Sequence, residues 1–206
     1  MTGNERVKIA VFISGRGSNM LSIAKSCMSG ILANCAEICT VFSDNPASPG
    51  IQKASELGLR SFCIPSARLS RVEFETKLIA DLETYKPDYI VLAGFRRILT
   101  KVFISAYKNR IINIHPADSK AFQGLNGYKW AFENKLPKTF ITVHFVDEGV
   151  DTGEVLAKQC VDLTGADTLD EVEKRGLAAE HELYPKVLAE FFSRKGNSSS
   201  TGKSGV

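Results

Sequence analysis

Short apolar runs alternate with segments of helical spacing along the first half of this chain, and this alternation constrains the fold more than any other feature. Strands are predicted at residues 7–14, 38–42, 61–64, 89–93 and 110–115. Helices are predicted between them, at residues 20–30, 51–57 and 71–85. Strands and helices that alternate in this way form a parallel sheet covered by helices on both faces. The expected fold is therefore α/β and Rossmann-like.

The second half of the chain predicts a different connection. Two apolar runs, residues 139–146 and 154–161, have only a short turn between them, which favours an antiparallel extension of the sheet. A long helix is expected to follow, because Thr168 and Glu171 have the spacing of a capping box. The sheet is thus expected to be mostly parallel and twisted, with an antiparallel C-terminal part.

Composition and charge exclude several classes of protein. With 44% hydrophobic residues and a net charge of +3, the chain has no basic excess that would indicate nucleic acid or a membrane as a partner. Five cysteines without a CxxC spacing favour reduced, packed thiols and a cytoplasmic location, and no signal peptide or membrane span is evident. We expect one domain over residues 1–193 and a disordered tail over 194–206.

One amide and one imidazole stand two residues apart at the end of a predicted strand. In the stretch RIINIHP, Asn113 and His115 point to the same face of the sheet, and Pro116 ends the strand. The carboxyl ends of parallel strands are where open α/β sheets bind ligands. An amide beside an imidazole polarises a carbonyl and moves a proton. A strand-end pair that only bonds local backbone is equally consistent with the sequence.

An acidic residue in the later loop adds to this pair. Asp151 lies between Gly149 and Gly153, and these glycines would permit close approach of the backbone to a ligand. A carboxylate near an imidazole favours the charged ring, although a turn-forming role is common for such an acid. His144 lies within an apolar strand and is expected to support the site or the core. The histidines lack clustered cysteine or acid partners, so we expect no metal site.

A glycine-rich turn, ISGRGSN, joins the first strand to the first helix. Gly17 permits a tight turn, Ser18 or Asn19 is expected to cap the helix, and free backbone N–H groups there attract a phosphate. Met20 replaces the third glycine of the dinucleotide fingerprint, which disfavours NAD but leaves a monophosphate possible. A plain strand-to-helix turn remains the alternative.

Two adjacent arginines, Arg96 and Arg97, follow the strand at residues 89–93. Their position at a carboxyl sheet end suits an anionic ligand. The alternative is one arginine stem packed on the protein beside one solvated head.

The combination of these segments resembles the folate-dependent phosphoribosylglycinamide formyltransferases, from about Val7 to Phe192. The landmarks are ISGRGSN, VFSDNPAS, KPDYIVLAGFRRIL, INIHP, TVHFVDEGVDTG and AEHELYP. The stretch ADSKAFQGLNGYKWAF departs from the family, which usually has a serine, two leucines and a proline after INIHP. Asn126 and Tyr128 stand where a histidine is common.

The resemblance implies a substrate and a role for several residues. The donor would be 10-formyltetrahydrofolate and the acceptor glycinamide ribonucleotide, with no metal, in a monomer or weak homodimer. His115 would be the proton donor, Asn113 would bind the formyl oxygen, and Asp151 would set the ionisation of His115. The phosphate and ribose would contact Gly17, Ser18, Asn19 and Glu180. The folate would contact Arg71, Arg96, Arg97, Ile98, Leu99, Asn113, Val146, Asp147 and Asp151.

Alternatives remain at this stage. Methionyl-tRNA formyltransferase shares the catalytic scaffold but carries an RNA-binding domain after it, and formyltetrahydrofolate hydrolase carries a regulatory domain before it. A non-catalytic nucleotide-binding module would require Asn113, His115 and Asp151 to be incidental.

Overall fold

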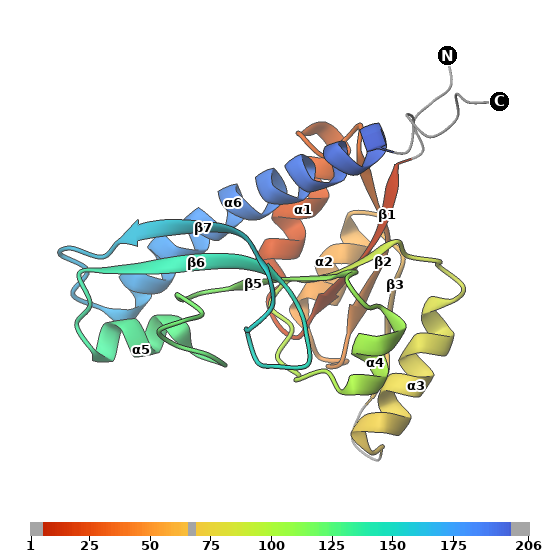
Figure 1. Cartoon of the computed structure of the whole chain (residues 1–206), viewed down its shortest axis with the longest axis horizontal. Coiled ribbons are helices and arrows are strands. Elements are labelled where there is room, and N and C mark those ends of the chain that lie inside the picture. The colour runs from red at the N-terminus through yellow and green to blue at the C-terminus, as the bar shows by residue number, and fades with distance from the viewer. Residues whose placement is uncertain (1–5, 66–68, 199–206) are drawn as a thin grey trace.

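One seven-stranded sheet organises the protein, with strand order β3-β2-β1-β4-β5-β6-β7 (Figure 1). The computed structural model describes residues 6–65 and 69–198. The strands are β1 (Val7–Ile13), β2 (Ala36–Ser43), β3 (Ser61–Cys63), β4 (Tyr89–Leu92), β5 (Ile111–His115), β6 (Lys138–Phe145) and β7 (Val155–Asp162). The first five strands pair in parallel, whereas β6 and β7 are antiparallel. This confirms the expected α/β class and its antiparallel extension.

Six helices accompany the sheet within the described ranges. They are α1 (Ser18–Ser29), α2 (Pro49–Glu56), α3 (Arg71–Leu82), α4 (Lys101–Ala106), α5 (Gly127–Glu133) and α6 (Leu169–Ser198). Neither α4 nor α5 was predicted from the sequence, because helices this short show no clear periodicity. A capping residue nevertheless marks the beginning of α4, because the side chain of Thr100, the N-cap, accepts a hydrogen bond from the Val102 N–H.

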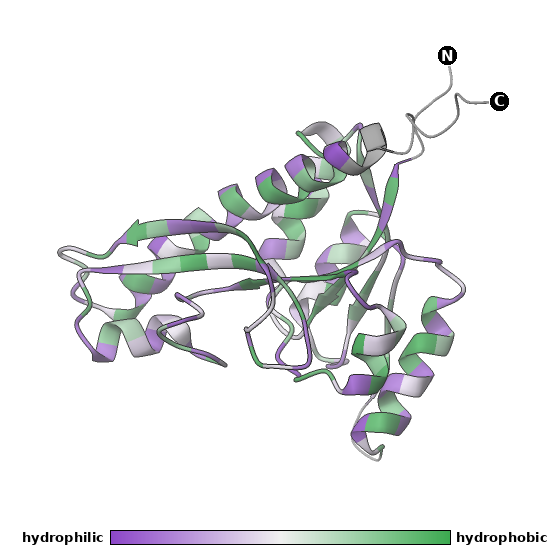
Figure 2. Ribbon diagram, in the orientation of Figure 1, coloured by the Kyte–Doolittle hydropathy of each residue, from purple (hydrophilic) through white to green (hydrophobic). Residues whose placement is uncertain are grey.

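The strand β1 lies between β2 and β4 and is apolar and buried from Ile9 to Ile13. Ile9 and Val11 pack into a core cluster with α1, α5 and α6, while Ala10 and Phe12 pack into a second cluster with α3 and α4. Side chains of a strand alternate between faces, so a strand covered on both faces must be apolar at every position. Figure 2 shows hydrophobic residues along the central strands and alternating hydropathy around the helices.

The long helix α6 crosses one face of the sheet beside α1 (Figure 1). Pro185 lies inside it and has no N–H to donate to the carbonyl of His181, one turn earlier. The Ser22 hydroxyl of α1 donates to that carbonyl instead, at 2.6 Å. Tyr184 fixes the other side of the helix, because its hydroxyl lies 3.1 Å from the Leu92 carbonyl oxygen and 2.9 Å from that of Ile112.

Two expectations need correction. The helix α6 continues to Ser198, so residues 194–198 are helical and the tail prediction is wrong there, while residues 199–206 lie outside the described ranges. Cys160 is exposed and is no packing residue, although all five thiols are free. In the described parts of the chain, no helix has the length and apolar content needed to cross a membrane.

Candidate active site

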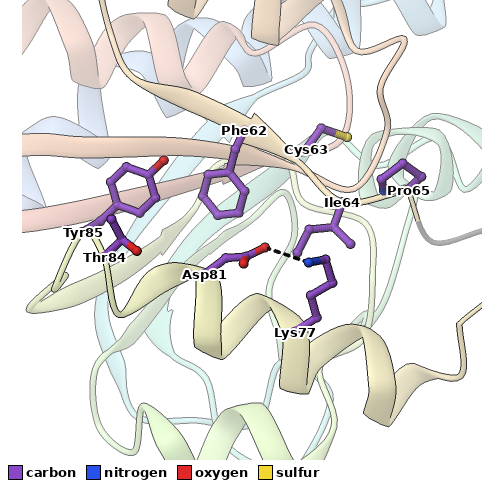
Figure 3. A pocket seen from close by; sticks show the side chains of 8 residues that line it. All are labelled: Phe62, Cys63, Ile64, Pro65, Lys77, Asp81, Thr84 and Tyr85. Carbon is purple, nitrogen blue, oxygen red and sulfur yellow. Dashed lines mark ion pairs between the residues drawn. The ribbon is translucent and has the colours of Figure 1, made fainter.

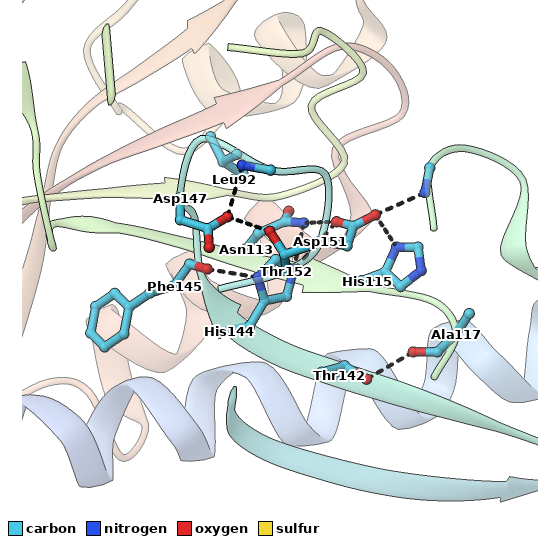
Figure 4. Close-up of polar contacts among 12 residues, drawn as sticks. Leu92, Asn113, His115, Ala117, Thr142, His144, Phe145, Asp147, Asp151 and Thr152 are labelled. Atoms are coloured by element: carbon cyan, nitrogen blue, oxygen red, sulfur yellow. Dashed lines mark hydrogen bonds and ion pairs between the residues drawn. The ribbon is translucent and has the colours of Figure 1, made fainter. Parts of the chain in front are cut away.

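The end of β5 carries Asn113 and His115, as predicted from the sequence. Both lie on the strand between β4 and β6, and Asn113 stands directly opposite His144 while His115 stands opposite Thr142 (Figure 4). The antiparallel register therefore brings His144 to the site from a strand that the chain reaches much later. His115 is 3% exposed and His144 1% exposed.

Asp151 joins this group from the loop between β6 and β7. Its carboxylate Oδ2 lies 3.3 Å from Nδ1 of His115, and its Oδ1 lies 3.4 Å from both Nε2 of His144 and Nδ2 of Asn113. The Gly124 N–H also donates to Oδ2, at 2.8 Å. The structure thus brings together the three residues of the expected catalytic group and adds His144 and Gly124.

The loop is longer than the short turn expected, since it covers residues 146–154. Asp151 has φ 54°, a left-handed conformation that is uncommon for a residue other than glycine. Gly149 and Gly153 were expected to allow close approach of a ligand. In the structure, other residues of the same chain pack closely against both glycines. A Cβ at Gly149 would collide with Thr152, and one at Gly153 with the Phe145 carbonyl.

The ring of His115 lies between two oxygen acceptors. Its Nε2 lies 2.9 Å from the carbonyl oxygen of Phe122, and its Nδ1 faces Asp151. A neutral ring donates from one nitrogen only, so the doubly protonated imidazolium is the form that satisfies both contacts. Burial nevertheless lowers the pKa of His115, while Asp151 and the Phe122 carbonyl oppose that effect. The sequence predicted that the carboxylate would favour the charged ring, but it did not indicate that burial of the ring would lower the pKa.

The carboxyl of Asp151 responds to the same neighbours. Burial raises its pKa, but the contacts with His144, the Gly124 N–H and the charge of His115 together bring that pKa below its usual value. Asp151 is therefore ionised at neutral pH, and its carboxylate accepts hydrogen bonds from the N–H groups around it.

The segment between β5 and α5 covers His115. The ring of Phe122 lies parallel to that of His115, with centroids 6.5 Å apart, and it stacks on Trp130 of α5 at 4.9 Å. Gly124 has φ 90°, which only glycine adopts readily. The contacts of the Phe122 carbonyl and the Gly124 N–H were not predicted from the sequence, because backbone contacts do not depend on the type of side chain.

The first βα turn differs from its predicted capping. Gly17, with φ 70°, is the N-cap of α1, and no side chain caps the helix. A Cβ at Gly17 would lie 2.9 Å from the Cα of Gly50, so this glycine also permits close packing against α2. Ser18 is half-buried, and the Asn19 side chain is buried and donates through Nδ2 to Oε2 of Glu180 on α6. The capping role predicted for Ser18 or Asn19 is wrong.

The residues expected to border the folate form two groups. Arg96 is exposed, and its N–H donates to the Ser14 hydroxyl at 2.9 Å, which joins the loop after β4 to the end of β1. The guanidinium of Arg97 lies 4.4 Å from the centroid of the Phe74 ring, so one of the two arginines packs on the protein and the other is solvated.

The remaining members of the folate set lie at the surface or just beneath it. Ile98 is 60% exposed and Leu99 is buried. Val146 is half-buried, and Asp147 is exposed and accepts from the N–H of Gly149 at 3.1 Å. Arg71 is the exposed first residue of α3.

Among the surface hollows that the described residues form are the following two. The larger, about 550 Å³, lies between the first βα turn and α6 and is lined by Arg16, Asp170, Glu173, Lys174, Leu177, Ala178 and His181. The smaller, about 320 Å³, lies between the edge strand β3 and α3 (Figure 3), and none of the predicted site residues lines either hollow. Within residues 6–65 and 69–198, no group of three or more His, Cys, Asp or Glu residues is arranged to hold a metal ion.

Comparison with known proteins identifies the family. A family model described as formyl transferase matches residues 7–188. Phosphoribosylglycinamide formyltransferase of Escherichia coli strain K12 is 34% identical and covers 90% of this chain and 87% of its own length. The chain belongs to the phosphoribosylglycinamide formyltransferase family. The enzyme of this family from Bacillus subtilis strain 168 is also 34% identical, over 88% of this chain and 92% of its own.

Solved structures of the family have the same fold. The phosphoribosylglycinamide formyltransferase of Bacillus halodurans superposes with a TM-score of 0.86 at 31% identity, over 91% of this chain and 96% of its own. The chain is also 34% identical to the trifunctional purine biosynthetic protein adenosine-3 of Drosophila melanogaster, of which it spans 14%. It is therefore a formyltransferase that matches bacterial members of the phosphoribosylglycinamide formyltransferase family along nearly their whole length.

Proposed function

We propose that this enzyme transfers the formyl group of 10-formyltetrahydrofolate to the amine of glycinamide ribonucleotide, in purine biosynthesis. The observation that carries the proposal is the cluster of Asn113, His115 and Asp151 at the end of β5, in a chain of this family. Its chemistry suits acyl transfer, because it offers a carboxylate that lies 3.3 Å from an imidazole and 3.4 Å from an amide nitrogen.

The two substrates approach the cluster from different sides. The hollow beside Arg16 and His181 lies next to the first turn of α1, whose free N–H groups and dipole suit the phosphate of the acceptor. The folate would lie along the exposed loop at Ile98 and the loop at residues 146–154, where an apolar side chain and polar backbone are available to a pterin. The amine and the formyl group would then meet at Asn113.

The reaction forms one C–N bond and breaks another. The acceptor amine adds to the formyl carbon, and the carbonyl oxygen becomes an oxyanion that Asn113 Nδ2 and the imidazolium of His115 stabilise. When the bond to the folate nitrogen breaks, that nitrogen takes a proton from His115, and Asp151 accepts the proton that the attacking amine loses. The products are the N-formyl nucleotide and tetrahydrofolate, with no net change in protons at the enzyme.

The contacts seen in the structure set the conditions for this chemistry. The Asn113 amide contacts are long, 3.3 Å to His144 and 3.4 Å to Asp151, so exchange of one of them for the formyl oxygen costs little. Both nitrogens of His115 already face protein oxygens, so the ring must exchange its contact with Asp151 or with Phe122 when it donates to the substrate.

One assay tests the proposal. The enzyme is incubated with 10-formyltetrahydrofolate and glycinamide ribonucleotide, the release of tetrahydrofolate is followed by absorbance, and the N-formyl product is identified by mass. A parallel reaction without the nucleotide measures hydrolysis of the folate. Tetrahydrofolate released at the same rate with and without the nucleotide would contradict transfer and indicate a hydrolase.

A further inference from the structure

A buried carboxylate joins helix α3 to the segment that enters α4. Glu75 of α3 is 3% exposed, and its carboxylate accepts hydrogen bonds from the N–H of Thr100, at 2.7 Å, and from the Thr100 hydroxyl. Thr100 is the N-cap of α4, and α3 and α4 pack against one another (Figure 1). A buried carboxylate is costly unless hydrogen bonds satisfy it, so this contact fixes the place where the two elements meet.

The segment at residues 94–100, which joins β4 to α4, has two different sides. Phe95 and Leu99 are buried in the core cluster that includes α3 and α4, whereas Arg96 and Ile98 are exposed. Alternation of buried and exposed residues indicates an extended chain. One side of the segment is therefore anchored in the core, and the other side faces outward.

Hydrogen bonds hold this segment at both ends. Near its beginning, the N–H of Arg96 donates to the Ser14 hydroxyl at 2.9 Å, and that hydroxyl donates in turn to the carboxylate of Asp44 at 2.7 Å. At its end, Thr100 donates twice to Glu75. The position of the exposed side therefore depends on two anchors, and Glu75 supplies the second of them.

We propose that Glu75 is a positioning residue for the folate substrate, because by binding Thr100 it fixes the segment 94–100, whose exposed side at Arg96 and Ile98 contacts the folate. This inference rests on the proposed function, which places the folate along this segment. A segment that is already fixed does not have to be ordered when the folate binds. Part of the folate affinity then comes from a buried residue that acts through Thr100.

Steady-state kinetics of the full chain test the assignment with two variants of Glu75. Glu75→Ala removes both acceptor oxygens, so the KM for 10-formyltetrahydrofolate should rise about tenfold, the cost of ordering a short segment on binding. The KM for glycinamide ribonucleotide should stay within about twofold and kcat at saturating folate within about threefold. Glu75→Gln keeps an oxygen for the Thr100 N–H and an amide N–H for the hydroxyl, so its folate KM should stay within about threefold of the wild-type value.

The matched control is Tyr85→Leu, which breaks the stacking of Tyr85 on Phe62, with ring centroids 5.4 Å apart, just beyond the other end of α3. It should lower the melting temperature and leave the folate KM at the wild-type value. Hydrogen exchange of the backbone amides at residues 95–102 should be faster in Glu75→Ala, but not in Glu75→Gln or Tyr85→Leu. Equal rises of both KM values in Glu75→Ala, or a Glu75→Gln variant that is equally impaired, would overturn the inference.

Isothermal titration calorimetry with tetrahydrofolate separates this inference from the proposed function, because it needs no acceptor. If Glu75→Ala binds tetrahydrofolate about tenfold more weakly but the wild type forms no N-formyl nucleotide, the transfer reaction is contradicted and the role of Glu75 is supported. Unchanged binding by Glu75→Ala, with a wild type that forms the product, would overturn this inference alone.

A second variant decides if Glu75→Ala does not fold. Thr100→Val removes the hydroxyl contact with Glu75 and keeps the N–H contact, so the folate KM should rise about threefold. An unchanged folate KM in this variant would overturn the role of the Glu75–Thr100 contact.

Discussion

The variant Asp151→Asn tests the electrostatic part of the site most directly. The amide has nearly the shape of the carboxylate, and its oxygen keeps the acceptor for the Gly124 N–H, but the negative charge 3.3 Å from the His115 ring is lost. Without that charge the imidazolium loses stabilisation while burial still opposes it. The pKa of His115 should therefore fall.

The size of the effect follows from the distance. At 3.3 Å and an effective dielectric constant of about 20, the attraction between the two charges is about 5 kcal/mol. The amide dipole of the variant retains part of this attraction, and Asp151 also contacts His144 in the wild type. We therefore expect the imidazolium of His115 to lose about 1.4 to 2.7 kcal/mol of stabilisation. At neutral pH, above the pKa of His115, this reduces the imidazolium fraction by about 10- to 100-fold, and turnover should fall by the same factor.

The assay is an NMR titration of the His115 ring together with a pH–rate profile. The wild-type rate should decline as pH rises through the pKa of His115, and in Asp151→Asn this decline should begin at lower pH. His181 is the reference signal, because His144 also contacts Asp151. Glu148→Gln is the matched control, since it removes an exposed charge from the loop of Asp151, where Glu148 pairs with Lys101 of α4. An unchanged His115 titration in a variant with low turnover would refute the electrostatic role and leave proton transfer or positioning.

Three further variants test other parts of the structure. His115→Ala should lower kcat by about a hundredfold or more, with some loss of stability because the ring is buried against Phe122, and near-normal turnover would contradict its role. Gly17→Ala should raise the KM for the phosphorylated acceptor about tenfold and leave the folate KM within about twofold, whereas an equal loss for both substrates would show a purely structural turn. Tyr184→Phe should lose about 1 to 3 kcal/mol of stability by thermal unfolding, because two buried carbonyl groups lose a donor, and an unchanged Tm would contradict that contribution.

The sequence predicted the framework because its signals are local. Continuous apolar runs specify strands covered on both faces, and the spacing of Asn113 and His115 on one strand puts both side chains on one face. Local signals did not predict α4 and α5, because these helices are too short to show a helical periodicity of apolar residues. They also did not predict the helix at residues 194–198, where α6 continues beyond its last apolar residues.

Contacts between distant segments could not be predicted from such signals. The spacing of Gly149 and Gly153 suggested ligand approach, but their neighbours in space are Thr152 and Phe145. The pairing of Asn19 with Glu180 joins residues 161 positions apart, and nothing local to either residue indicates it. The capping role expected of Asn19 was wrong for this reason.

The amino-acid sequence by itself determined the α/β class, the strand end that carries Asn113 and His115, and the loop that carries Asp151. Only the tertiary structure decided the charge environment of that site, because burial depends on what packs over a residue. The backbone of Phe122 and Gly124 closes over His115 and Asp151, and burial then lowers the pKa of the histidine against the pull of the carboxylate. A pattern of residue types specifies which groups can meet, whereas their solvation is fixed when the whole chain has folded around them.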